Sequence, residues 1–318
     1  MVCQIMVMRT PHPMEQVSRR TLHRQRYSQK LWVSDVKLYL LWFEFLAISP
    51  SYELARRFRA GDCAPDEVFP ADFDEVLSVF DNLGDVQRTL FNTWWRKVAV
   101  LHFGHQGKPP LVEKVAEVPH SPDALPALTK EVDEYFANDW VEQGRQNTIL
   151  LAIPVGMPDG KINQQIKKHL ARVKSDRRQL IKPDPTYSLV GKRRHQDALM
   201  RYLRMVWFRS AMHKSSLWRV GAQAEVSETY SPVLDPKMEE VSPDDSVDRQ
   251  MLTIIASRAL LRARMIAENA ARGRFPTHET CPHARDFDFE EMNTRLDLRN
   301  KWQDRAIERL LKKYGQVV

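Results

Sequence analysis

Glycine is scarce in this chain, with 11 residues among 318. Tight β-turns and phosphate-binding loops both depend on glycine, because only glycine adopts the required backbone conformations without strain. The low glycine content therefore argues against an all-β architecture and against a glycine-rich nucleotide cradle.

Cysteine and long apolar runs are also scarce. The three cysteines, Cys3, Cys63 and Cys281, are too few and too scattered for a disulfide framework, which favours a reducing compartment. The longest apolar run, residues 36–48, is interrupted by two charged side chains and is too short to span a bilayer. The first residues lack the basic-then-apolar order of a secretory signal. We expect a cytoplasmic protein with no membrane partner.

Positive charge is concentrated in one region. Residues 161–220 hold 16 Lys or Arg and three acids, a net charge of +13, whereas the whole chain is +7. Such a segregated field attracts a polyanion, because each neutralised phosphate releases condensed counterions. Tyrosine and tryptophan side chains interleave the charges, so the stretch can also fold. A solvated basic face without a partner is the alternative interpretation.

Apolar periodicity predicts a mainly α, multi-helical fold with a small central α/β segment and a C-terminal helix-turn-helix unit. Composition shifts and proline clusters suggest the domain boundaries. These give a basic arm over 1–30, an N-terminal helical domain over 31–103, a linker over 104–127, a central α/β segment over 128–182 and a C-terminal helical domain over 183–318.

The prediction of a central α/β segment rests on three patterns: a strand, a loop and a basic helix. Residues 148–155 read TILLAIPV, a short apolar run bounded by polar residues and by Pro154, which is typical of a strand. Residues 161–174 then predict a basic amphipathic helix. Residues 111–118 could form a further short strand within the linker.

The residues after the basic stretch resemble a helix-turn-helix in their physical pattern. A short helix beginning at Leu217 carries Gly221 and Ala224, whose small side chains let another helix cross closely. Val226 lies in the turn, where it can plug the angle between the helices, while Glu225 occupies the place of the usual turn glycine. Ser227 can cap a recognition helix. An ordinary helix-loop-helix packing unit is the alternative.

Two sets of contact residues follow from this pattern. Base contacts are expected from Ser227, Glu228, Thr229, Tyr230 and Arg219. Phosphate contacts are expected from Lys167, Lys168, Arg172, Arg177, Arg178, Lys192, Arg193, Arg194, Arg201, Arg204 and Lys214. On the second long helix, Arg258, Arg262, Arg264 and Arg272 could line a dimer seam or cradle nucleic acid.

Near the N-terminus, Trp42-Phe43-Glu44-Phe45-Leu46 is followed by Ser49-Pro50-Ser51-Tyr52. This box resembles the one that opens a transcriptional-regulator-like domain common on bacterial mobile elements, although Phe43 is inserted between the tryptophan and the glutamate. The resemblance covers about a dozen residues. It implies DNA binding through a helix-turn-helix, and it implies no catalytic residues.

Enzymatic alternatives fit less well. His169 and Arg172, with His195 and Tyr202, have the order of a tyrosine-recombinase site, but a second arginine and the strand lysine lack convincing places. An Asp235-Pro236-Lys237 element typical of metal-dependent nucleases lacks its strand context.

Metal binding is a further open alternative. His278, Cys281 and His283 supply three soft ligands, whereas a structural zinc site needs four, so a plain loop is favoured. We expect no cofactor.

The sequence thus predicts a non-enzymatic DNA-binding protein, a transcriptional regulator of a phage or mobile element. The alternatives are a nucleic-acid-holding subunit of a larger assembly and, third, a strand-cleaving enzyme that uses Tyr202. The expected partner is nucleic acid, with DNA favoured over RNA. A homodimer or a protein partner is also considered.

Overall fold

The computed structural model describes residues 31–33, 35–106, 109, 112–119, 121, 124–143, 145, 147–173, 185–191, 194–238 and 243–314, without the side chains of residues 106, 172, 173, 243 and 314. The predicted basic arm, residues 1–30, lies outside this part of the chain.

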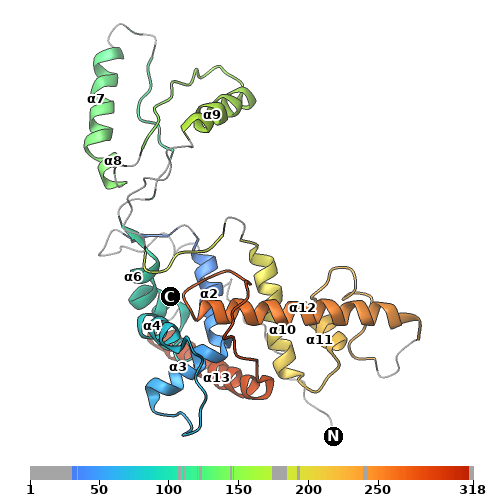
Figure 1. Cartoon of the computed structure of the whole chain (residues 1–318). Helices are drawn as coiled ribbons and strands as arrows, with labels where there is room; N and C mark the ends of the chain where they lie inside the picture. The colour runs from blue at the N-terminus through green and yellow to red at the C-terminus, as the bar shows by residue number, and fades with distance from the viewer. Residues whose placement is uncertain are drawn as a thin grey trace. The chain divides into compact units, whose positions relative to one another are not determined.

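The described residues are mainly helical, as predicted (Figure 1). The elements in order are β1 (Leu31–Trp32), α2 (Val36–Ile48), α3 (Pro50–Ala60), α4 (Phe73–Leu83), α5 (Phe91–Trp94), the π-helix η1 (Trp95–Ala99), α6 (Val100–Phe103), β2 (His105–Gln106), α7 (Ala124–Ala137), α8 (Asp139–Glu142), α9 (Asp159–Val173), α10 (Gln196–Ala211), α11 (Leu217–Gln223), the 3-10 helix η3 (Pro243–Asp245), α12 (Ser246–Ala270) and α13 (Phe289–Tyr314).

The chain divides into two compact units. Among the described residues, unit 1 combines residues 35–103 with those from residue 186 onward, and unit 2 comprises residues 31–33 and those between 104 and 185. The predicted N-terminal and C-terminal helical domains therefore pack together as one unit, which differs from the division expected from sequence. The reason is physical: α2 is apolar nearly all round, and α12 and α10 from the later part of the chain pack against it.

Local capping explains how α2 passes into α3. Ser49 ends α2, and its Oγ accepts a hydrogen bond from the Tyr52 backbone N–H at 3.2 Å, with Pro50 at the first position of α3. Gly61 closes α3 in the left-handed region at φ 75°. Ser49, Pro50 and Gly61 are the residue types that local capping favours at these three positions.

The box formed by residues 42–52 lies in the core of unit 1. Trp42 is fully buried, and its Nε1 donates to the backbone carbonyl of Ala270 at 3.2 Å. Glu44 accepts two hydrogen bonds from the guanidinium of Arg299, at 2.7 and 2.8 Å, and both side chains are buried. This box therefore contributes its polar side chains to internal packing.

Glu268 on α12 organises a second buried polar cluster. Its carboxylate accepts from Ser49 Oγ at 2.7 Å and from Ser51 Oγ at 2.5 Å, and it lies 3.1 Å from Arg272 Nη1. Arg272 also makes a bidentate pair with Asp72 at 2.7 and 2.8 Å. The hydrogen bonds from Arg272 hold the pKa of Asp72 below its ordinary value. The cluster fixes the start of α3 against α12.

The two strands of unit 2 have two residues each. Strands β1 and β2 pair antiparallel, with Leu31 opposite Gln106 and Trp32 opposite His105. Trp32 stacks on the His105 ring with a centroid separation of 4.7 Å. Helices α7, α8 and α9 supply the rest of its regular structure.

The strand that we predicted in the central α/β segment is wrong. Residues 148–154 form no β-bridge with any described residue, and the same holds for residues 112–119 of the predicted linker. A strand exists only where a neighbouring strand accepts its backbone hydrogen bonds, and sequence periodicity contains no information about that neighbour. The helix that follows, α9, is present as predicted.

Within the described ranges, none of the helices combines the length and the apolar character that crossing a bilayer requires.

Candidate nucleic-acid interface

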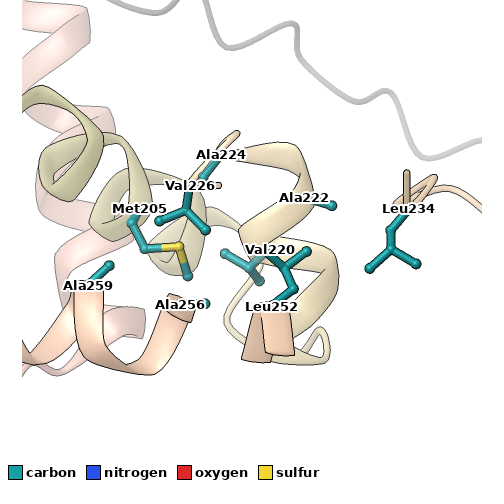
Figure 2. Packing of buried hydrophobic residues seen from close by; sticks show 9 residues of the cluster. All are labelled: Met205, Val220, Ala222, Ala224, Val226, Leu234, Leu252, Ala256 and Ala259. Atoms are coloured by element: carbon teal, nitrogen blue, oxygen red, sulfur yellow. The ribbon is translucent and has the colours of Figure 1, made fainter. Parts of the chain in front are cut away.

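The candidate interface is built around α10, α11 and α12 of unit 1. A cluster of buried side chains joins them: Met205, Val220, Ala222, Ala224, Val226, Leu234, Leu252, Ala256 and Ala259 (Figure 2). Val226 lies in the turn after α11 and is buried in this cluster, as predicted. The turn is therefore anchored to the helices by an apolar side chain.

Gly221 sets the separation between α11 and α12. A Cβ added at Gly221 would lie 3.2 Å from Ala256 Cβ and 3.3 Å from both Leu252 Cγ and Val226 Cγ1. Distances this short leave no room for a larger side chain. The expectation that a small residue permits a close helix crossing is correct, and the crossing helix is α12.

The recognition helix predicted after Ser227 is absent. Residues 228–233 form successive turns, so a helix-turn-helix unit is not confirmed. Ser231 Oγ donates to the Gly221 carbonyl at 3.2 Å and accepts from the Ser227 backbone N–H at 3.1 Å. Such local side-chain bonds compete with a helical ladder, and Pro232 removes one backbone donor.

Glu225 gives the turn its shape. Its φ of 51° lies in the left-handed region, which a glycine would adopt without cost. The sequence pattern placed Glu225 where a glycine is usual, and the structure shows this residue taking the glycine-like conformation.

The five predicted base-contact residues have different environments. Glu228 and Thr229 are exposed on the turn, and Ser227 is half-buried with its Oγ accepting from the Tyr230 backbone N–H at 3.2 Å. The Tyr230 ring packs against the buried cluster. Arg219 lies over the Trp218 ring at 5.1 Å and donates to the Met238 carbonyl at 2.7 Å. Arg219 and Tyr230 thus have structural roles.

Three of the predicted phosphate contacts are arginines engaged within unit 1. Arg201 Nη1 lies 3.2 Å from Glu228 Oε1, and Arg204 Nη1 lies 3.1 Å from Glu225 Oε2. Arg194 Nη2 donates to the Leu189 carbonyl at 2.9 Å.

The lysines of the set differ from these arginines. Lys167 and Lys168 on α9 and Lys214 after α10 are exposed, with no ion-pair partner among the described residues. The side chain of Arg172 and the residues Arg177, Arg178, Lys192 and Arg193 lie outside the described part of the chain. Lys167 and Lys168 belong to unit 2, whereas Lys214 belongs to unit 1, so one continuous basic surface is not established.

Two of the cations of α12 considered for a dimer seam or a nucleic-acid cradle, Arg258 and Arg262, lie on the surface. Both are exposed and, among the described residues, neither forms an ion pair. Arg262 Nη1 donates to Tyr202 Oη at 3.0 Å, which brings α12 beside the basic face of α10. Their spacing of four residues places both on one side of α12.

The other two arginines considered on this helix are structural. Arg264 pairs with Asp286, and Arg272 is buried against Asp72 and Glu268. Neither contributes to an open surface.

The residues of the recombinase pattern fall in both units. His169 lies on α9 of unit 2, whereas His195 and Tyr202 lie at the start of α10 and on α10 in unit 1. The Tyr202 hydroxyl oxygen accepts a hydrogen bond from Arg262 Nη1.

The metal-site pattern finds no support in the geometry. The described residues contain no group of three His, Cys, Asp or Glu side chains arranged to hold an ion. Burial raises the pKa of the Cys281 thiol, although the charge on nearby Arg272 opposes that rise. A thiol that stays protonated is a poor metal ligand.

Comparisons of the chain with protein-family models, with curated proteins and with solved structures give no match. The resemblance of residues 42–52 to the regulator-like domain therefore stays a prediction.

Proposed function

We propose that the protein binds nucleic acid through contacts to the phosphodiester backbone, without catalysing a reaction on it. The proposed surface comprises Arg201, Arg204, Lys214, Arg258 and Arg262 on and beside α10 and α12. The resemblance of residues 42–52, which implies DNA binding, agrees with this proposal.

The observation that carries the proposal is the contact between Arg262 and Tyr202. It joins α12, whose exposed Arg258 and Arg262 form no ion pair with the described residues, to the helix that holds Arg201 and Arg204. Unpaired guanidinium groups that lie beside a tyrosine hydroxyl suit phosphate oxygens, because all of these groups can donate hydrogen bonds to them.

The two paired arginines can join this surface at little cost. Their partners, Glu225 and Glu228, have side chains 74% and 91% exposed, so solvent screens both ion pairs. A phosphate can replace an exposed carboxylate on the same guanidinium. The carboxylate is planar and the phosphate is tetrahedral, but each is an oxyanion that accepts two hydrogen bonds from a guanidinium.

The proposal is tested by the salt dependence of binding to a labelled random-sequence duplex. Each phosphate contact adds roughly 0.9 to the slope of log affinity against log salt. We expect the double variant Arg258→Ala/Arg262→Ala to lower this slope by roughly two.

The matched control is Arg88→Ala/Lys97→Ala, which removes two exposed cations from the segment between α4 and α6. It loses the same net charge and should leave the slope close to that of the parent protein. Equal slopes for the two double variants, or no binding at 50 mM salt, would overturn the proposal.

Sequence-selective reading is the second candidate, and the exposure of Glu228 and Thr229 directly after α11 favours it. Selection of bound fragments from a random DNA pool tests it. Enrichment of one sequence that is lost in Thr229→Ala, while affinity for random DNA persists, would support a regulator. A pool that stays random supports the backbone-binding version.

A further inference from the structure

Two ion pairs on the proposed surface share one geometry. Arg201 and Arg204 lie three residues apart on α10. Their partners, Glu228 and Glu225, are likewise three residues apart, in the turn after α11. Residues three apart on a helix are neighbours on its surface. The turn therefore presents two carboxylates to two adjacent guanidinium groups, with N–O distances of 3.2 and 3.1 Å.

In both pairs the carboxylate is the more exposed member. The side chains of Glu228 and Glu225 are 91% and 74% exposed, whereas those of Arg201 and Arg204 are 38% and 27% exposed. A phosphate must displace these carboxylates to bind the guanidinium nitrogens that they occupy, because one donor cannot serve both oxyanions fully.

The backbone of this acidic turn, residues 225–231, is anchored independently of the ion pairs. Val226 is buried in one cluster with Met205 of α10 (Figure 2). Ser231 is buried as well, and its Oγ donates to the Gly221 carbonyl and accepts from the Ser227 backbone N–H. The two glutamate side chains can therefore leave the arginines by rotation about their own bonds while the turn stays in place.

Glu225 has a backbone conformation that a glycine would adopt without strain, with a φ of 51°. A glycine at this position would supply no carboxylate. Strained residues cluster at ligand-binding and switch positions, where other contacts offset the strain. Here the contacts come from Arg204, which binds the Glu225 carboxylate through Nη1 and donates from Nη2 to the Glu225 carbonyl at 3.4 Å. The turn thus keeps an acid where the backbone favours glycine.

We propose that Glu225 and Glu228 form an autoinhibitory contact, in which their carboxylates take the place of two phosphates on Arg201 and Arg204 until a nucleic acid displaces them. The inference rests on the proposed function, because it concerns the regulation of the same surface. It adds that the arginines of α10 are available only to a ligand that competes with both carboxylates.

This arrangement favours ligands with a high density of phosphates. Arg258 and Arg262 on α12 form no ion pair with the described residues, so a single phosphate can bind there without displacing an acid. Opening an exposed ion pair lowers affinity by up to about fivefold. Only a ligand whose neighbouring phosphates reach both arginines of α10 regains this loss, and a polynucleotide carries a phosphate at every step of its chain.

A double-mutant cycle on binding tests the competition. The measurement is the fluorescence anisotropy of a labelled random-sequence duplex at 50 mM salt. We expect Glu228→Gln to raise the affinity about three- to tenfold in the parent protein, but less than about twofold in Arg201→Met, where the carboxylate has no guanidinium to occupy. The loss of one negative charge is the same in both proteins, so general repulsion does not produce this difference.

The second arginine supplies the matched control. Glu228 pairs with Arg201, so Glu228→Gln should keep its full gain in Arg204→Met. The reciprocal cycle uses Glu225→Gln, whose gain should persist in Arg201→Met and shrink in Arg204→Met. Methionine keeps an aliphatic stem at each arginine position, and thermal unfolding of every variant identifies any change that comes from a loss of fold.

Equal gains in all three proteins would overturn the autoinhibitory role and leave nucleic-acid binding itself standing, because the carboxylates would then act by repulsion alone. The role is also overturned if neither glutamine variant binds more tightly than the parent. A parent protein that does not bind the duplex contradicts the proposed function itself, and the inference falls with it.

Discussion

Arg204 on α10 holds Glu225 in the turn after α11, with Nη1 3.1 Å from the Glu225 carboxylate. Glu225 itself has a φ of 51°, a conformation that L-residues rarely adopt. One residue therefore shapes the turn and neutralises a cation of the proposed interface.

We predict that Glu225→Gln and Glu228→Gln each raise the affinity for random DNA at low salt, by about three- to tenfold, because each change frees an arginine for phosphate and removes a repulsive charge. Fluorescence anisotropy at two salt concentrations measures both effects. The control Glu75→Gln removes the same charge from an exposed position on α4, a helix that packs against α3. The prediction fails if this control raises the affinity equally.

A second prediction concerns the turn itself. Glu225→Gly should leave the protein as stable as the parent or more stable, because glycine adopts the left-handed conformation without strain. Glu225→Ala, which keeps the strain and loses the same carboxylate, is the matched control and should be less stable than the glycine variant by about 1 kcal/mol. Urea unfolding measures the difference. Equal stability of the two variants would refute strain at this position.

A third prediction follows from the close crossing at Gly221. Gly221→Val should lower the free energy of unfolding by about 1–3 kcal/mol, because the added methyl groups would collide with Leu252 and Ala256. Gly156→Val is the control, since no atom lies within 4 Å of a Cβ at that position. Thermal unfolding of the two variants compares them, and similar melting temperatures would contradict the close approach of α11 and α12.

A fourth prediction concerns the buried pair of Glu44 and Arg299. Arg299→Met should cost about 3–5 kcal/mol of unfolding free energy, because it leaves the Glu44 carboxylate buried without a partner. Glu44→Leu/Arg299→Met should recover most of this loss.

The control for that pair lies on the same helix. Lys301 makes an exposed ion pair with Asp297 at 2.6 Å, and Lys301→Met should change the unfolding free energy by less than about 1 kcal/mol. Chemical denaturation of the variants measures these differences. A cost for Arg299→Met as small as that for Lys301→Met would mean that the pair is not buried.

A fifth prediction concerns alkaline pH. Burial raises the pKa of Tyr39 from 10.0 to about 12, because the phenolate is disfavoured away from water. The folded state therefore binds this proton more tightly than the unfolded state. The corresponding stability is complete below pH 10 and is lost as the pH rises toward 12, by about 2–3 kcal/mol.

Urea unfolding between pH 8 and 12 measures this loss. Tyr39→Phe should flatten that part of the curve, because phenylalanine has no proton to lose. An unchanged pH dependence in this variant would show that other groups account for the alkaline instability.

Sequence patterns predicted the helices well where the signal was local. Ser49 and Pro50 mark the start of α3, and Gly61 marks its end, because capping depends on a few neighbouring residues. The helix α9 was likewise evident from its apolar spacing.

Features that depend on distant residues were not predictable in this way. The segment 148–155 has a strand-like composition, yet the pairing partner of a strand is a property of the whole fold. The same limit applies to the polar cluster at Glu268, because nothing near that residue in sequence indicates Ser49 and Ser51 as its partners.

The candidate site shows a similar division. Its basic residues could be recognised from their charge in the sequence. Which of them form ion pairs depends on the acids that the fold brings near them. Glu225 and Glu228 neutralise Arg204 and Arg201 from the turn, whereas Arg262 contacts Tyr202 and pairs with none of the acids in the described part of the chain. Composition records the number of charges and does not record these pairings.

Trp42 and Ala270 lie 228 residues apart in the chain and are joined by one buried hydrogen bond. During synthesis, the apolar helix α2 leaves the ribosome long before the segment that covers it has been made. At 5–20 residues per second, that interval is on the order of ten seconds or more. We therefore expect the apolar surface of nascent α2 to stay uncovered until translation reaches α12, and the inserted unit 2 lengthens this delay.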